Sequence, residues 1–312
     1  MDSIRVFAPA TVANVSCGFD IFGLAVDNPG DEVIVRKRKD DKIVITQITG
    51  DEGKLTLDPL RNAVSVPIFK YLHQLNRNHG FDIELHKQMP LGSGLGSSSA
   101  SSVAGVFAVN ELLGKPMPVR DLLPFAMEGE RVACGSAHAD NVAPALLGGF
   151  VVVRSYSPLD VFKIKTPDDL YVTIVHPDIE VNTKDARHIL RNEVSMKKTI
   201  SQMGNVAGMI TGLITSDYEL IGRSMVDYII EPIRSILIPQ FFEVKMAAMD
   251  NGALGCSISG AGPSVFAFSK GLETAQKVGA VMKKQFEKEG IVANLFVSGI
   301  NEVGPKMLEQ GG

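Results

Sequence analysis

The stretch Met89-Pro-Leu-Gly-Ser-Gly-Leu-Gly-Ser-Ser-Ser-Ala100 constrains this chain more than any other. Before it, apolar and polar residues alternate from Phe81 to His86, which predicts a strand. After it, apolar residues recur at helical spacing until Gly114-Lys115-Pro116, which predicts a helix and its end. A strand, a glycine loop and a helix N-terminus suit an anion, because the unpaired N–H groups of the first helical turn face it. The sequence therefore predicts a phosphate-binding loop, and a nucleoside triphosphate is its expected ligand.

The loop differs from two familiar nucleotide-binding loops. A P-loop requires Gly-Lys-Ser or Gly-Lys-Thr at its end, and no lysine occurs between Lys87 and Lys115. The glycines at 92, 94 and 96 do not match the dinucleotide fingerprint Gly-x-Gly-x-x-Gly either. A merely flexible Gly/Ser connection is the remaining alternative, and the flanking strand and helix argue against it.

The stretch from Pro90 to Ala100 resembles the second motif of the GHMP kinases, the small-molecule kinases named for galactose, homoserine, mevalonate and phosphomevalonate. The resemblance implies that ATP and Mg²⁺ are the cofactors. It implies that the nucleotide is held by Pro90, Leu91, Gly92, Ser93, Gly94, Leu95, Gly96, Ser97, Ser98, Ser99 and Ala100.

An earlier segment, Pro9-Ala-Thr-Val-Ala-Asn14 followed by Gly18-Phe19-Asp20, bears on the substrate. Asn14 and Asp20 could be simple turn formers. As a site, they offer the amide and the carboxylate needed to hold an alcohol and an ammonium group. The segment resembles the first motif of homoserine kinases, whereas the Gly-Glu-His start of mevalonate kinases is absent. The resemblance implies that Asn14 and Asp20 contact the substrate.

His138, Asp140 and Asn141 form a polar cluster in the middle of the chain. A solvated turn and a surface histidine are the alternatives to an active site here. The cluster resembles homoserine kinases, in which the histidine contacts substrate, and a glutamate and a serine matching Glu130 and Ser98 hold magnesium. Which of Asp140 and Asn141 meets the substrate hydroxyl stays open. If it is Asn141, catalysis rests on positioning and charge neutralisation without a general base.

Two arginines in the second half, Arg187 and Arg234, are ordinary surface residues by default. Their settings, Thr-x-x-Ala-Arg and Glu-Pro-x-Arg, resemble the segments by which homoserine kinases hold an amino-acid carboxylate. A helix is predicted to begin at Asn182, just before Arg187. The Gly/Ser stretch 255–268 resembles the third GHMP motif, and a plain glycine-rich hairpin is the alternative.

The remaining elements predict an α+β protein of two domains, residues 1–165 and 166–312. A helix is expected over 62–79, with Asn62 either at its N-cap or, by resemblance, at the adenine or ribose. Strands around 33–35 and 43–45 predict a hairpin or meander, and 291–298 the last strand. The resemblance implies the two-domain GHMP kinase fold, with an N-terminal domain like domain 2 of ribosomal protein S5 and a ferredoxin-like C-terminal domain.

Composition excludes several classes of protein. The net charge is −4, and no basic run exceeds Arg36–Lys39, so nucleic acid is not an expected partner. The three cysteines at 17, 134 and 256 show no Cys-x-x-Cys spacing, which argues against zinc, redox and disulfide sites and favours small buried residues. No signal peptide and no run of about 18 apolar residues is present, which predicts a cytoplasmic protein without a membrane partner. The oligomeric state stays open, a homodimer included.

The resemblance covers about residues 4 to 300 and implies ATP-dependent phosphorylation of the L-homoserine hydroxyl to O-phospho-L-homoserine, a step toward threonine. L-homoserine and ATP are then the small-molecule partners. One alternative is another GHMP kinase of the mevalonate-pathway type, which the ammonium partner Asp20 disfavours. The other alternative is a non-catalytic binding protein with this fold, which Ser98 and Glu130 disfavour.

Overall fold

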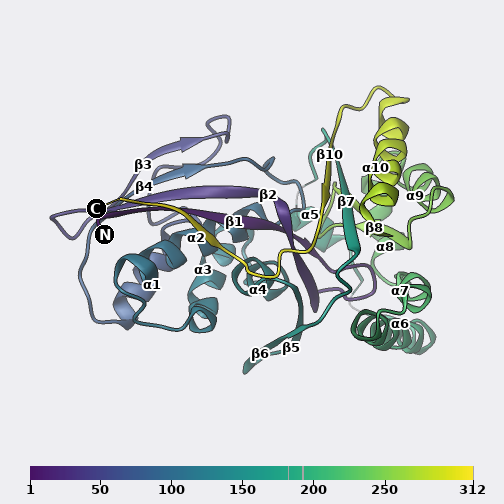
Figure 1. Ribbon diagram of the computed structural model, residues 1–312, viewed down its shortest axis with the longest axis horizontal. Coiled ribbons are helices and arrows are strands. Elements are labelled where there is room, and N and C mark those ends of the chain that lie inside the picture. The colour runs from purple at the N-terminus through teal and green to yellow at the C-terminus, as the bar shows by residue number, and fades with distance from the viewer. Residues whose placement is uncertain (182, 192, 312) are drawn as a thin grey trace.

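The computed structural model of the chain describes residues 1–181, 183–191 and 193–311. Within them, a seven-stranded sheet runs along the long axis of the molecule. A four-stranded sheet lies toward the end of the molecule away from the two termini (Figure 1). The seven strands are β1 (Ser3–Ala13), β2 (Phe22–Lys37), β3 (Ile43–Thr49), β4 (Phe81–His86), β5 (Phe150–Tyr156), β6 (Leu159–Ile164) and β11 (Lys306–Gly311). The four strands are β7 (Leu170–Pro177), β8 (Gly255–Ile258), β9 (Val265–Lys270) and β10 (Ala293–Ser298).

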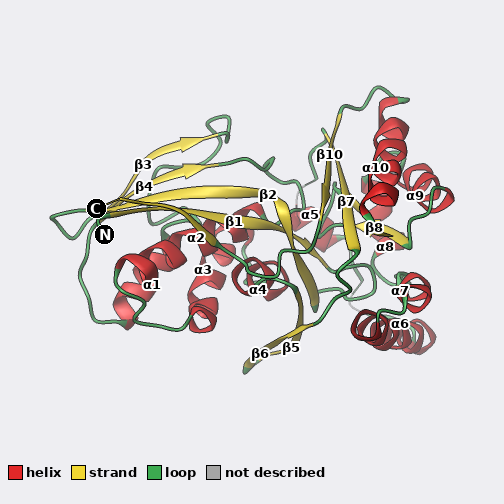
Figure 2. Ribbon diagram, in the orientation of Figure 1, coloured by secondary structure: helices red, strands yellow, loops and turns green. Residues whose placement is uncertain are grey.

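Four helices lie on one side of the first sheet (Figure 2). They are α1 (Val66–Gln74), α2 (Ser97–Leu112), α3 (Leu123–Cys134) and α4 (Ala139–Leu147), with the 3-10 turn η1 (Val119–Leu122) before α3. Helices α2 and α4 pack directly on β1 and β2, and α1 and α3 pack on α2. Nearly every side chain of α2 is buried, so this helix is enclosed by sheet on one side and by helices on the other.

Strands β7, β8 and β9 of the second sheet are buried on both faces, and the edge strand β10 is partly exposed. Along β7, Val172 and Ile174 belong to the large core shared with the first sheet, whereas Val175 faces a second core under α10. Continuous apolar runs are what a strand covered on both faces requires. The helices here are α5 (Thr183–His188), α6 (Met196–Thr215), α7 (Tyr218–Ser224), α8 (Glu231–Arg234), α9 (Phe241–Asp250) and α10 (Leu272–Glu287), with the 3-10 turn η2 (Ser235–Leu237).

The pairing of β3 differs from the sequence expectation. The predicted hairpin of β2 and β3 is wrong, because β4 lies between these strands and β3 pairs with β4 in parallel. Parallel neighbours need a long connection. Residues 50–80, which include α1, supply it.

Helix boundaries follow local chemistry. The helix predicted over 62–79 is only α1, because an Asx turn precedes it and Asn76 adopts φ 50° after it. Pro67 lies in the first turn of α1, where its missing N–H costs nothing. The polar cluster 138–141 is not a turn, since His138 is the N-cap residue of α4. Asn182, the predicted start of the helix that carries Arg187, lies outside the described residues.

The division predicted at 165/166 falls between β6 of the first sheet and β7 of the second. The strand predicted as the last one, β10, is followed by a further strand, β11. Strand β11 returns to the first sheet and pairs antiparallel with β1. Residues 306–311 thus belong to the sheet of the first half. Among the described residues, no helix is long and apolar enough to cross a membrane. Cys17 and Cys256 are buried as predicted, whereas Cys134 is only partly buried.

Candidate active site

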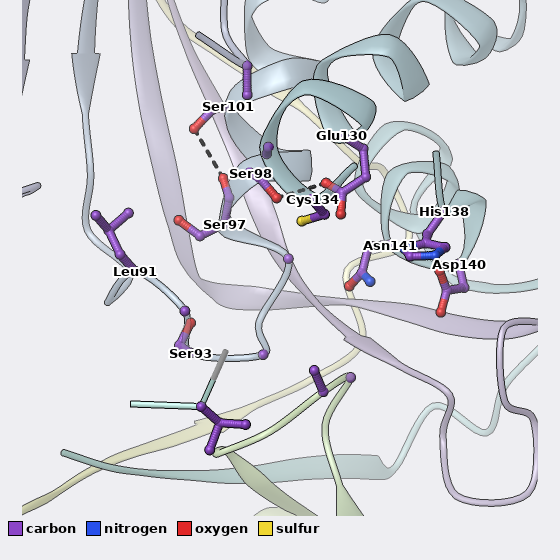
Figure 3. A pocket seen from close by; sticks show the side chains of 18 of the residues that line it. Leu91, Ser93, Ser97, Ser98, Ser101, Glu130, Cys134, His138, Asp140 and Asn141 are labelled. Atoms are coloured by element: carbon purple, nitrogen blue, oxygen red, sulfur yellow. Dashed lines mark hydrogen bonds between the residues drawn. The ribbon is translucent and has the colours of Figure 1, made fainter. Parts of the chain in front are cut away.

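A cavity of about 490 Å³ gathers residues from both halves of the chain. Among the residues expected at the site, it is lined by Asn14, Asp20, Asn62, Leu91, Gly92, Ser93, Gly94, Gly96, Ser97, Ser98, Glu130, His138, Asp140, Asn141, Arg187 and Arg234. Figure 3 shows Ser98 and Glu130 facing each other, with His138, Asp140 and Asn141 grouped beside them. Four residues of the predicted loop do not line it: Pro90, Leu95, Ser99 and Ala100.

The three glycine-containing motifs are joined by hydrogen bonds. Ser259 Oγ donates to the carbonyl of Gly94 over 2.8 Å, and Asn14 Nδ2 donates to the carbonyl of Gly260 over 2.8 Å. Gly94 has φ 75°, and a Cβ there would lie 2.5 Å from the Ser259 carbonyl oxygen. Only glycine permits both this conformation and this approach.

The end of the loop positions Asn141. Gly96 has φ 67°, and a Cβ there would lie 2.1 Å from Thr11 Oγ1 and 2.9 Å from Asn141 Oδ1. Thr11 Oγ1 donates to Asn141 Oδ1 over 2.7 Å. Because the amide oxygen already has this donor, the N–H groups of Asn141 are available to an oxygen atom of a ligand. Toward a ligand in the cavity, the side chain of Asn141 is thus a hydrogen-bond donor.

Glu130 belongs to α3, is 4% exposed, and its side chain meets the first turn of α2 (Figure 3). Its Oε2 accepts hydrogen bonds from Ser98 Oγ at 2.7 Å and from Ser99 Oγ at 2.9 Å. In the described residues it has no cationic partner, and no three His, Cys, Asp or Glu side chains there are grouped to hold a metal alone. A buried carboxylate whose partners are hydroxyls is a suitable ligand for a hard cation that takes its other ligands elsewhere.

Sequence reasoning missed the buried ion pair beneath the loop. Lys87 Nζ contacts Asp31 Oδ2, and it donates to the carbonyl of Ser97 at 2.9 Å and to Ser101 Oγ at 2.8 Å. Asp31 also accepts from Ser97 Oγ and from the backbone N–H groups of residues 88 and 89. The pair thus fixes β2, the start of the loop and the first turn of α2 to one another. A signal was present, since Lys87 continues the inward positions 81, 83 and 85 of its strand.

Asp140 is 3% exposed, and its Oδ1 has no hydrogen-bond partner in the structure. Burial raises the pKa of this carboxyl to about 8, and the nearby Asp20 and Glu130 add to the effect. At pH 7 the side chain is therefore mostly neutral. Burial also lowers the pKa of His138, so its ring is neutral at pH 7. A carboxyl that keeps its proton at pH 7 is not suited to act as a general base at that pH.

Charged side chains gather at the opposite end of the cavity. Arg187 donates two hydrogen bonds to Asp20, Nη1 to Oδ1 at 3.2 Å and Nη2 to Oδ2 at 2.5 Å. Arg234 is 4% exposed and donates to the backbone carbonyls of Ala186 and Gly260 at 3.1 and 2.9 Å. In the described part of the chain no carboxylate forms an ion pair with Arg234, and Asp20 and Asp227 act on it only from a longer distance, so a buried cation lines the cavity without a directly bonded counter-charge.

Two predicted ligand contacts have internal partners. Asn14 accepts from the backbone N–H of Asp20 at 3.0 Å, so both ends of its amide are used by the backbone. Asn62 likewise donates to the carbonyl of Thr56 and accepts from the N–H of Val64. Both residues line the cavity, and both hold its wall in shape. The N-cap residue of α1 is Ser65, so Asn62 forms a turn three residues before the cap and is not the cap itself.

Known proteins resemble this chain along its whole length. The family descriptions "GHMP kinases N terminal domain" and "GHMP kinases C terminal" match residues 63–149 and 209–288. The homoserine kinase of Chlorobium phaeobacteroides (strain BS1) is 50% identical over 320 residues, covering 99% of this chain and 100% of that protein. The crystal structure of homoserine kinase from Cytophaga hutchinsonii ATCC 33406 is 60% identical with a TM-score of 0.97, covering 99% and 98% of the two chains. The chain belongs to the homoserine kinase family of GHMP kinases.

Membership of this family confirms the predicted two-domain GHMP kinase fold and the prediction of an ATP-using kinase. A mevalonate kinase of Methanococcus jannaschii has a TM-score of 0.69 at 16% identity, covering 98% of each chain. That likeness shows a common fold alone. The mevalonate-type alternative is accordingly not favoured.

Proposed function

We propose that this protein transfers the γ-phosphoryl group of ATP to the hydroxyl of L-homoserine, giving O-phospho-L-homoserine. The observation that carries the proposal is the joint presence, in one cavity, of a phosphate loop and of Asp20, Arg187 and Arg234. The carboxylate suits the ammonium group of an amino acid, and planar guanidinium groups suit its carboxylate. The name of the relatives supports the same substrate.

The phosphate end accounts for the nucleotide. The loop and the N-terminus of α2 offer N–H donors to the triphosphate, and the wall formed by Leu55, Thr56, Asn62 and Leu91 leaves room for the base. Ser98 and Glu130 would hold Mg²⁺, since a hydroxyl and a buried carboxylate are oxygen donors of the kind that this ion takes. When bound, the ion would supply neutralisation of the charge on the transferring phosphoryl group.

The chain's own residues place the acceptor. Asn141 donates to the substrate hydroxyl, whose oxygen attacks the γ-phosphorus as the bond to ADP breaks. Neutral Asp140 lies beside it without taking the proton, which passes to an oxygen of the transferred phosphoryl group and from there to water. Positioning of this kind supplies a large part of the barrier reduction in phosphoryl transfer.

A coupled assay of ADP release tests the proposal. With ATP fixed, homoserine, threonine, serine and mevalonate are compared, and turnover is expected with homoserine far above the others. Absence of ADP release with homoserine would contradict it, and binding of ATP without turnover would favour the non-catalytic alternative. A cytoplasmic location and a homodimer stay predictions.

A further inference from the structure

The ring of Phe19 lies close to both arginines of the amino-acid end. The guanidinium carbon Cζ of Arg187 is 5.5 Å from the ring centroid, and that of Arg234 is 5.1 Å from it. Both distances are within the range of cation–π attraction. Phe19 is half-buried, lines the cavity, and lies between Gly18 and Asp20 in the connection from β1 to β2.

The charges around this ring do not balance. Asp20 pairs with Arg187, whereas Arg234 has only backbone carbonyls as partners among the described residues. Two cations with one carboxylate leave an excess of one positive charge. A zwitterionic amino acid does not change this excess, but each of its charged groups finds opposite charge here: its carboxylate can meet the two guanidinium groups and its ammonium can meet Asp20.

Binding such a zwitterion rearranges the ion pair. If Asp20 turns to the ammonium, Arg187 loses the partner that fixes its two Nη atoms. The two guanidinium groups must then converge on one carboxylate in spite of their mutual repulsion. A π-face shared by both cations counters this repulsion before and after the substrate binds.

We infer that Phe19 is a positioning residue that holds Arg187 and Arg234 in place for the carboxylate of the substrate. The inference rests on the proposed function. It implies that Phe19 discriminates between alcohols with and without a carboxylate, although its ring forms no hydrogen bond with either. Gly18 supports this placement, because a Cβ there would meet the side chain of Phe22 at 2.1 Å.

The test compares Phe19→Leu, which keeps apolar bulk, with Phe19→Tyr, which keeps the ring. KM and kcat are measured for homoserine. Inhibition constants are measured for 4-hydroxybutyrate, which lacks the ammonium, and for 3-aminopropan-1-ol, which lacks the carboxylate. Phe19→Leu is expected to raise the homoserine KM about 5- to 30-fold, the worth of one or two partly desolvated cation–π contacts. Phe19→Leu should raise the inhibition constant of 4-hydroxybutyrate by a similar factor. The inhibition constant of 3-aminopropan-1-ol and the KM for ATP should stay unchanged, and Phe19→Tyr should stay near wild type in all of these constants.

If Phe19→Leu raises both inhibition constants equally, or raises neither, the inference is overturned, because a merely structural role would not distinguish the two inhibitors. Should Phe19→Leu not fold, Phe19→Met provides the same comparison. Failure of the proposed function is a separate outcome. It would be seen in the wild-type protein, as an absence of ADP release with homoserine.

Discussion

The ion pair at the phosphate end of the cavity is sealed inside the protein, whereas the ion pair at the amino-acid end is partly open to solvent. The side chains of Lys87 and Asp31 are 1% and 0% exposed, and those of Arg187 and Asp20 are 42% and 25% exposed. The Lys87–Asp31 pair fixes β2, the start of the loop and the first turn of α2 to one another. The Arg187–Asp20 pair joins groups that a substrate can separate. The nucleotide half is thus built in advance, and the amino-acid half is completed by its ligand.

The largest effect is expected from breaking the sealed pair. Lys87→Met leaves Asp31 buried without its cation, which typically costs about 3–5 kcal/mol of the free energy of unfolding. Urea denaturation measures it. Lys283→Met is the matched control, because the side chains of Lys283 and its partner Glu287 are 39% and 51% exposed, and exposed pairs contribute about 0–1 kcal/mol. A loss as small as that of the control would show that the phosphate end does not depend on the buried pair.

The second effect concerns Glu130. Glu130→Gln keeps the shape of the side chain and removes its charge, so metal-stabilised charge in phosphoryl transfer should be lost at a cost of several kcal/mol. We expect kcat to fall by about 10²–10³-fold with an unchanged fold. Glu128→Gln on the same helix, whose partner Arg131 is exposed, is the control. Near-wild-type kcat in a folded Glu130→Gln enzyme would remove Glu130 from the site.

The residues behind these two predictions differ in how well they could be identified from the sequence alone. The loop and Ser98 follow from a local pattern, because strand, glycine loop and helix are consecutive in the chain. Glu130 lies 32 positions after Ser98 and was predicted only from the resemblance to homoserine kinases. Lys87 with Asp31 was missed, although both lie at inward strand positions, because their pairing joins residues 56 positions apart. The same limit applies to the parallel pairing of β3 with β4 and to the pairing of β11 with β1, since the residues of a strand do not determine which strand it pairs with.

The third effect compares the two arginines. Lysine cannot present a planar, bidentate donor, so Arg187→Lys and Arg234→Lys should each raise KM for homoserine. Truncating one member of a buried charged pair costs about 2–5 kcal/mol, and the milder lysine change should lie at or below this range. Arg234→Lys is expected to have the larger effect because Arg234 is buried. KM for ATP should move little. If both variants raise the KM for ATP and leave the KM for homoserine unchanged, these arginines bind the nucleotide.

The smallest effect on turnover is expected at Asp140, between the two ends. Burial raises the pKa of its carboxyl from the ordinary 3.8 to about 8, so at pH 7 it is mostly a neutral acid that asparagine can imitate. A general base contributes about 10²–10⁴-fold, and Asp140→Asn should lose much less in kcat between pH 6 and 9. Loss of that size, together with loss of a step in the pH profile, would show that Asp140 is a base.

Stability provides an independent test of the same shift in the pKa of Asp140. Between pH 3.8 and about 8 the folded protein holds a proton on Asp140 that the unfolded chain has released, so the contribution of this group to stability falls as pH rises. Below that window both states are protonated, and above it the penalty is fully present. Asp140→Asn removes the penalty, so the variant should gain stability over wild type at pH 8.5 and little or none at pH 4.5. Thermal denaturation at both values measures the difference. A gain that is the same at both pH values would mean that the Asp140 carboxyl ionises normally in the folded protein, and Asp140 would then join Asp20 and Glu130 as a third charge in the cavity.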